Sequence, residues 1–136
     1  MIQVRYPALV IVAGVLLCRA GVSDATDLDW KIDEETAQHL AAEGWDHGKS
    51  PRWFDYDPGL GRPFFVFYGL NKSDGGFGYF AVNPWTGEVW ALWGCHKLST
   101  PALRRDLAAI QRRFKPEEIK EYARLSRLKP ECIVED

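Results

Sequence analysis

The sequence predicts a single α+β domain in which one helix precedes a three-stranded antiparallel sheet with a bulged hairpin, and two helices packed on the sheet follow it. Three observations support this fold class. Apolar residues recur at helical spacing in two regions, short apolar runs separated by turn residues lie between them, and no internal repeat is present. We expect residues 26–136 to form this one domain, since their length suits one hydrophobic core.

The first 25 residues predict a cleaved signal peptide. Arg5 is followed by an apolar run over residues 8–18 and then by small and polar residues up to Ala25. The run is too short to span a bilayer, which needs about 20 apolar residues. Cleavage after Ala20 or after Ala25 fits the pattern, and Ala25 is preferred. We therefore expect a periplasmic or secreted protein without stable membrane insertion after cleavage.

The first predicted helix covers residues 33–45. Asp33 is placed to cap its N-terminus, and Gly44 is placed to end it. Its apolar face would consist of Ala37, Leu40 and Ala41. Residues 47–62 are rich in glycine and proline, so they predict a long irregular connection.

Three apolar runs predict the strands of the sheet, over residues 63–70, 77–82 and 88–93. Residues 83–87 join the last two. Pro84 suits the first central position of a type I turn, and Gly87 suits a left-handed position that closes a bulged hairpin.

Two amphipathic segments predict the C-terminal helices. The first has Thr100 as its cap and Pro101 in its first turn. The second begins at Pro116 and stops before Pro130. The buried positions expected in the first helix are Leu103, Leu107, Ile110 and Phe114, and those expected in the second are Ile119, Tyr122 and Ala123.

Two cysteines, Cys95 and Cys132, follow the predicted signal peptide. An even number of cysteines in an exported chain predicts a disulfide. Such a bond would enclose both C-terminal helices and contribute about 4 kcal/mol to the free energy of unfolding. A disulfide would also remove the thiol that Cys95 and His96 would need to act as a nucleophile and base.

The hairpin from Gly78 to Trp90 contains the run Val82-Asn83-Pro84-Trp85-Thr86-Gly87-Glu88-Val89. This run resembles the strand-turn-strand signature of PepSY-type domains, which are small exported modules. The resemblance covers about a tenth of the chain. It implies a non-catalytic module that inhibits or binds a protein in the cell envelope.

Aromatic residues in predicted loops indicate a binding surface. Trp53, Phe54 and Tyr56 lie in the long connection, and Trp85 lies at the tip of the hairpin. Tryptophan and tyrosine are enriched at binding hot spots, which favours a protein partner. The alternative is a small hydrophobic cluster beneath the loop.

The formal net charge is −2, with acidic residues in excess over residues 26–96 and basic residues in excess over residues 97–129. Arg105 and Arg112 are one helical repeat apart and would bind an anionic partner. The alternative is a solvated helix face complementary to the acidic half of the domain. We expect no nucleic-acid partner.

The leading hypothesis is an exported, non-enzymatic module that binds a protein in the cell envelope, as an inhibitor or an immunity protein. No motif predicts a catalytic site, and we expect neither a cofactor nor a metal. Two alternatives remain open. One is a protein that binds peptidoglycan or another carbohydrate, and the other is a small hydrolase that uses His47, Asp55 and Asp57 with a metal.

Overall fold

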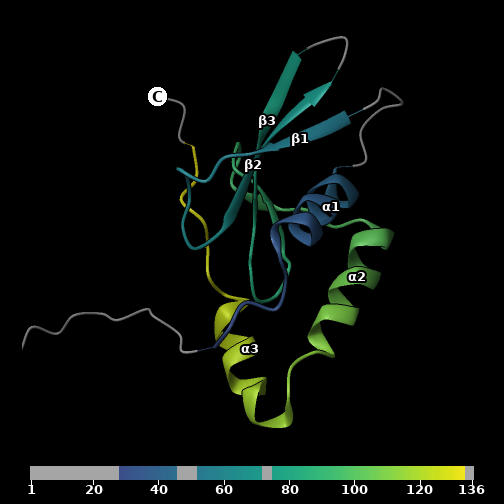
Figure 1. Ribbon diagram of the computed structural model, residues 1–136, viewed down its shortest axis with the longest axis vertical. Coiled ribbons are helices and arrows are strands. Elements are labelled where there is room, and N and C mark those ends of the chain that lie inside the picture. The colour runs from purple at the N-terminus through teal and green to yellow at the C-terminus, as the bar shows by residue number, and fades with distance from the viewer. Residues whose placement is uncertain (1–27, 46–51, 72–74, 134–136) are drawn as a thin grey trace, which may run out of the picture.

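The computed structural model describes residues 28–45, 52–71 and 75–133 (Figure 1). A five-stranded antiparallel sheet has the order β1-β2-β3-β4-β5, with one helix before it and further helices after it. The strands are β1 (Arg52–Tyr56), β2 (Phe65–Asn71), β3 (Gly75–Val82), β4 (Val89–Ala91) and β5 (His96–Lys97). The helices are α1 (Glu34–Gly44), α2 (Pro101–Gln111), the 3-10 helix η1 (Pro116–Glu118) and α3 (Ile119–Leu125). The predicted signal peptide lies outside the described residues.

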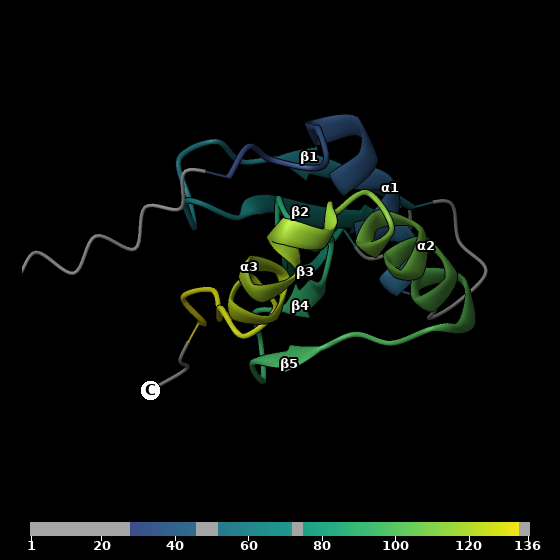
Figure 2. The same ribbon diagram turned by 90° about the horizontal axis from the view of Figure 1, so that it is seen from below.

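Helices cover one face of the sheet, and the C-terminal segment runs along the other (Figure 2). On the helix side, Phe54, Phe67 and Phe80 from three adjacent strands pack in one cluster with Leu40 of α1 and Leu103 of α2. These side chains alternate with residues that point to the opposite face, as the pleat of a strand requires. The sheet therefore presents two faces that different parts of the chain cover.

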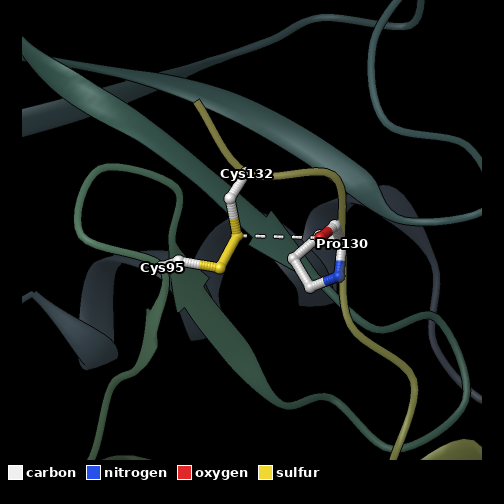
Figure 3. The surroundings of a disulfide bond; sticks show 3 residues. All are labelled: Cys95, Pro130 and Cys132. Atoms are coloured by element: carbon white, nitrogen blue, oxygen red, sulfur yellow. Dashed lines mark hydrogen bonds between the residues drawn. A yellow bond between two sulfur atoms is a disulfide. The ribbon is translucent and has the colours of Figure 1, made fainter. Parts of the chain in front are cut away.

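The C-terminal segment, residues 128–133, covers the β3–β4 half of the second face. Leu128 packs against a buried cluster of Phe64, Val66, Ala81, Trp90 and Leu92. The Ile133 N–H donates to the Leu92 carbonyl at 3.2 Å. A disulfide between Cys95 and Cys132 holds the end of this segment beside β4 (Figure 3). The predicted disulfide is thus confirmed.

The turn between β3 and β4 is buried at the end of the sheet, where α3 lies (Figure 1). Asn83 is fully buried, and its Nδ2 donates to the Leu125 carbonyl at 2.9 Å. Its Oδ1 accepts hydrogen bonds from the Trp85 and Thr86 N–H groups. One side chain therefore shapes the turn and joins it to the end of α3.

The cap predictions for α1 and α2 are confirmed. The Asp33 side chain accepts from the Thr36 N–H at 2.8 Å, and the Thr100 hydroxyl accepts from the Leu103 N–H at 3.1 Å. The predicted turn is confirmed as well, since Gly87 has a φ of 78° and its N–H donates to the Asn83 carbonyl. A side chain at this left-handed position would be strained.

The predicted buried face of the last helix is wrong at Ile119 and Ala123, whereas Tyr122 is half-buried and packs on Phe114. Ile119 is 49% exposed and Ala123 is also exposed, whereas Leu125 is fully buried. The reason is that α3 packs against the buried turn with its C-terminal end. Leu125 contacts Trp85 and Phe114 in a cluster of its own.

The prediction of a three-stranded sheet is also wrong, because β1 and β5 were not expected. β1 lies inside the predicted loop of residues 47–62, where Phe54 and Tyr56 alternate with Trp53 and Asp55. The glycines and prolines of that stretch flank the strand and do not interrupt it. β5 contains two residues, too few to show an alternating pattern.

Replacing Asn83 with alanine should lower the free energy of unfolding by about 3 kcal/mol or more, because it leaves buried groups of the turn and of α3 without partners. Urea denaturation of both proteins measures the difference. The control is Gln111→Ala, which removes an exposed amide from α2 and should change the value by less than about 0.5 kcal/mol. Equal effects of the two substitutions would contradict the role assigned to Asn83.

Replacing both cysteines with alanine should lower the free energy of unfolding by about 4 kcal/mol, since the bond closes a loop with a sequence separation of 37. Urea denaturation with and without a thiol reductant measures this. The reductant should destabilise the wild-type protein and leave the double variant unchanged. A reductant effect of equal size on both proteins would rule out the disulfide as its cause.

An ion pair attaches the N-terminal segment to η1. Lys31 Nζ lies 2.9 Å from Glu118 Oε2, and the Lys115 N–H donates to the same carboxylate. The Lys115 N–H first, and then Lys31, hold the pKa of Glu118 below its ordinary value of 4.5. This stabilisation is complete above pH 4.5, because the unfolded carboxyl group is ionised there, and it disappears as the pH falls through the lowered pKa.

Glu118→Gln should therefore reduce the dependence of stability on pH below about pH 4.5. Melting temperatures of both proteins across the acid range measure this effect. The two proteins should differ most at neutral pH and converge under acid conditions. A difference that is constant with pH would contradict the role of the carboxylate charge.

Candidate binding surface

The β1–β3 half of the second sheet face carries a row of aromatic and apolar side chains. We call this surface the open face and define it by Trp53, Asp55, Tyr68, Leu70 and Tyr79. Their places follow from strand alternation, since Phe54, Phe67 and Phe80 occupy the helix side of the same strands. The C-terminal segment packs over the neighbouring half of this face, next to Tyr79.

The strand register places the residues of the open face opposite one another on adjacent strands. Asp55 lies opposite Tyr68, and Tyr68 lies opposite Tyr79 on the next strand. The two tyrosine rings have their centroids 4.8 Å apart. Trp53 lies opposite Leu70 and remains 42% exposed. Cross-strand neighbours of this kind pack together, so the five side chains form one continuous surface.

Gly76 makes room for Tyr68 on this surface. A side chain at position 76 would collide with the ring and hydroxyl of Tyr68, which lie over the backbone of β3. The register also shifts at this point, between Gly69 and Leu70. The glycine and the irregularity together let the Tyr68 ring lie along the sheet.

Two of the predicted contact residues are buried, which corrects the sequence prediction. Trp85 is 5% exposed, and its indole Nε1 donates to the Leu28 carbonyl at 2.8 Å. It does not project from the hairpin, because the N-terminal segment and α3 enclose the turn. Phe54 is 3% exposed, because it faces the helices from β1. Neither side chain is available to a partner in this fold.

The other aromatic residues predicted in the loop separate onto two faces. Trp53 belongs to the open face. Tyr56 is half-buried on the helix side, where its ring lies 6.0 Å from that of Phe65 and 5.6 Å from that of Phe67. The predicted surface of Trp53, Phe54, Tyr56 and Trp85 is therefore not a single surface, and only Trp53 of this set lies on the open face.

Arg105 and Arg112 are exposed on α2, which covers the opposite face of the sheet. Neither side chain has a hydrogen bond or ion pair within the part of the chain that the structure describes. Their neighbours do have partners, since Arg104 donates to Ser99 and Arg113 donates to the Lys31 carbonyl. Anion binding by Arg105 and Arg112 therefore stays a prediction. The pair lies on the other side of the sheet from the open face.

The residues considered for a metal site do not form a cluster where they are described. His47 lies outside the described residues. Asp55 is exposed on the open face, and Asp57 accepts a hydrogen bond from the Gly59 N–H at 3.0 Å. In residues 28–45, 52–71 and 75–133, no group of three or more histidine, cysteine, aspartate or glutamate side chains is arranged to hold a metal ion.

Tyr68, Leu70 and Tyr79 were not predicted as site residues. They lie in apolar runs that the sequence predicted only as strands of the sheet. The signal that would have located them is alternation from Phe67 and Phe80, combined with the polar residue Asp55 in the newly recognised edge strand. These positions can be assigned to one face only once β1 is known to pair with β2.

Comparison with known proteins shows one distant similarity of fold. No family model and no curated protein matches the chain. A chain in a solved type VI secretion system effector-immunity complex from Pseudomonas protegens is similar over 72% of this chain and 91% of that chain, with 17% identity and a TM-score of 0.47. Among the described residues, no helix has the length and apolar character required to cross a membrane.

Proposed function

We propose that the protein is an exported, non-enzymatic binding module that recognises a protein partner in the cell envelope, as an inhibitor or immunity protein does. The observation that carries the proposal is the open face. It places Trp53, which is 42% exposed, beside two tyrosines and a leucine that are half-buried, and together they form one sheet surface. The predicted export and the disulfide suit an oxidising compartment outside the cytoplasm.

A continuous aromatic surface is typical of a binding site. The domain buries its other sheet face under two helices and half of this face under the C-terminal segment. The chain thus has segments that cover apolar surface, yet on the open face Trp53 remains exposed and Tyr68, Leu70 and Tyr79 are only half-buried. Contiguous exposed apolar patches on folded domains commonly mark interaction sites, and tryptophan and tyrosine supply much of the binding energy at protein interfaces.

The arrangement of the rings favours a protein partner over a polysaccharide. The planes of Tyr68 and Tyr79 are inclined by 39°, so the two rings present a ridged surface. Two inclined rings do not form the flat aromatic platform on which a sugar ring stacks, whereas tyrosine is enriched at protein interfaces. Binding to peptidoglycan is the alternative, and a capture experiment distinguishes it from binding to a protein.

Trp53→Ala and Tyr68→Ala should each weaken partner binding at least about tenfold, because each removes a large aromatic contact. The mature, oxidised wild-type protein and both variants are immobilised and exposed to envelope extract of the native organism. Bound proteins are then quantified by mass spectrometry. The partner is the protein that the wild type retains in stoichiometric amount and that both variants lose.

The matched control is Ile119→Ala, which removes an apolar side chain that is 49% exposed on α3 and lies outside the open face. It should retain the partner as the wild type does. Circular dichroism and urea denaturation establish that all variants are folded. A partner retained equally by all four proteins would contradict the open face as the binding surface, and retention on insoluble cell wall instead would favour the polysaccharide alternative.

A further inference from the structure

Asp55 is the one charged side chain among the five that define the open face. β2 and β3 have the sequences FVFYGLN and GGFGYFAV and contain no charged residue. In β1 the charged residues are Arg52 and Asp55. Strand alternation assigns Asp55 to the open face, together with Trp53. Asp55 is thus the charged residue among the five side chains that define this face.

Asp55 has no counter-charge of its own in the described part of the chain. Its side chain is exposed and has neither an ion pair nor a hydrogen bond there. It lies directly across from Tyr68, whose ring in turn packs with that of Tyr79. A row of three side chains therefore crosses the strands, with Asp55 on β1, Tyr68 on β2 and Tyr79 on β3.

Binding of a partner would remove water from this row. A carboxylate that loses its hydration without gaining a cation costs several kcal/mol, which would oppose binding over the whole face. A cation in the same place makes two favourable interactions, since it pairs with the carboxylate and also lies against an aromatic ring. The chemistry of the row therefore selects for a partner with a positive group at this position.

We propose that the partner inserts an arginine or lysine side chain between Asp55 and the Tyr68 ring. Arginine suits the position best, because its planar guanidinium stacks on an aromatic ring while donating two hydrogen bonds to a carboxylate. The inference rests on the proposed function and adds the chemistry of the partner. The aromatic residues supply contact area, and Asp55 makes the surface discriminate against partners that lack the cation.

The first test is Asp55→Asn in the capture experiment, with Glu117→Gln as the control. Both substitutions replace an exposed carboxylate with an amide of the same shape, but Glu117 lies in η1. The protein that depends on Tyr68 should bind Asp55→Asn at least about tenfold more weakly and should bind Glu117→Gln as it binds the wild type. If that protein binds Asp55→Asn normally, the proposed cation is wrong while the open face stands. If no captured protein depends on Tyr68, the proposed function itself fails.

A second test needs no identified partner. The wild-type protein is titrated with N-acetylarginine amide and with N-acetylcitrulline amide, which replaces the guanidinium with a neutral urea group. Nuclear magnetic resonance follows the ring signals of Tyr68 and Tyr79. The arginine compound should shift these signals more than the citrulline compound does, and Asp55→Asn should abolish the difference. Equal shifts from the two compounds would overturn the proposal.

Discussion

The buried amide of Asn83 sets the path of the chain around the sheet. Its Oδ1 holds the β3–β4 turn in shape, and its Nδ2 binds the carbonyl of Leu125 at the end of α3. The N-terminal segment joins at the same place, because the Lys31 and Ile32 N–H groups both donate to the Pro84 carbonyl. Three segments distant in sequence therefore meet at one turn. Because the hydrogen bonds of Asn83 are buried, an alternative arrangement would leave their polar atoms without partners.

The position of α3 in turn decides which part of the second sheet face is covered. The chain leaves α3 at Leu125 and reaches the end of β4 by residue 133, where the Ile133 N–H donates to the Leu92 carbonyl and the disulfide joins Cys132 to Cys95. This short segment spans only the β3–β4 half of the face. Trp53 remains exposed and Tyr68 and Tyr79 remain half-buried as a consequence, so the open face results from the same constraints that stabilise the domain. A preformed, rigid surface of this kind loses little conformational entropy on binding.

Local signals in the sequence predicted the parts of the fold that depend on neighbouring residues. The caps at Asp33 and Thr100 and the left-handed Gly87 each follow from steric or hydrogen-bonding rules within a few positions. The missed features depend on distant contacts. β1 is recognisable only through its pairing with β2, since its five residues stand among turn-forming residues. Trp85 was expected at an exposed tip because a turn normally projects into solvent, whereas Leu28 and α3 cover this one.

The central claim is that the uncovered half of the sheet is the surface that binds. Hydroxyl-radical labelling of the free protein and of its complex with the captured partner, read by mass spectrometry, tests it residue by residue because exposed aromatic side chains are oxidised readily. The account predicts that oxidation of Trp53, Tyr68 and Tyr79 falls strongly in the complex, while that of Trp30, which is exposed and contacts Phe65 on the helix side, is unchanged. Protection of Trp30 with unchanged oxidation of the two tyrosines would contradict it.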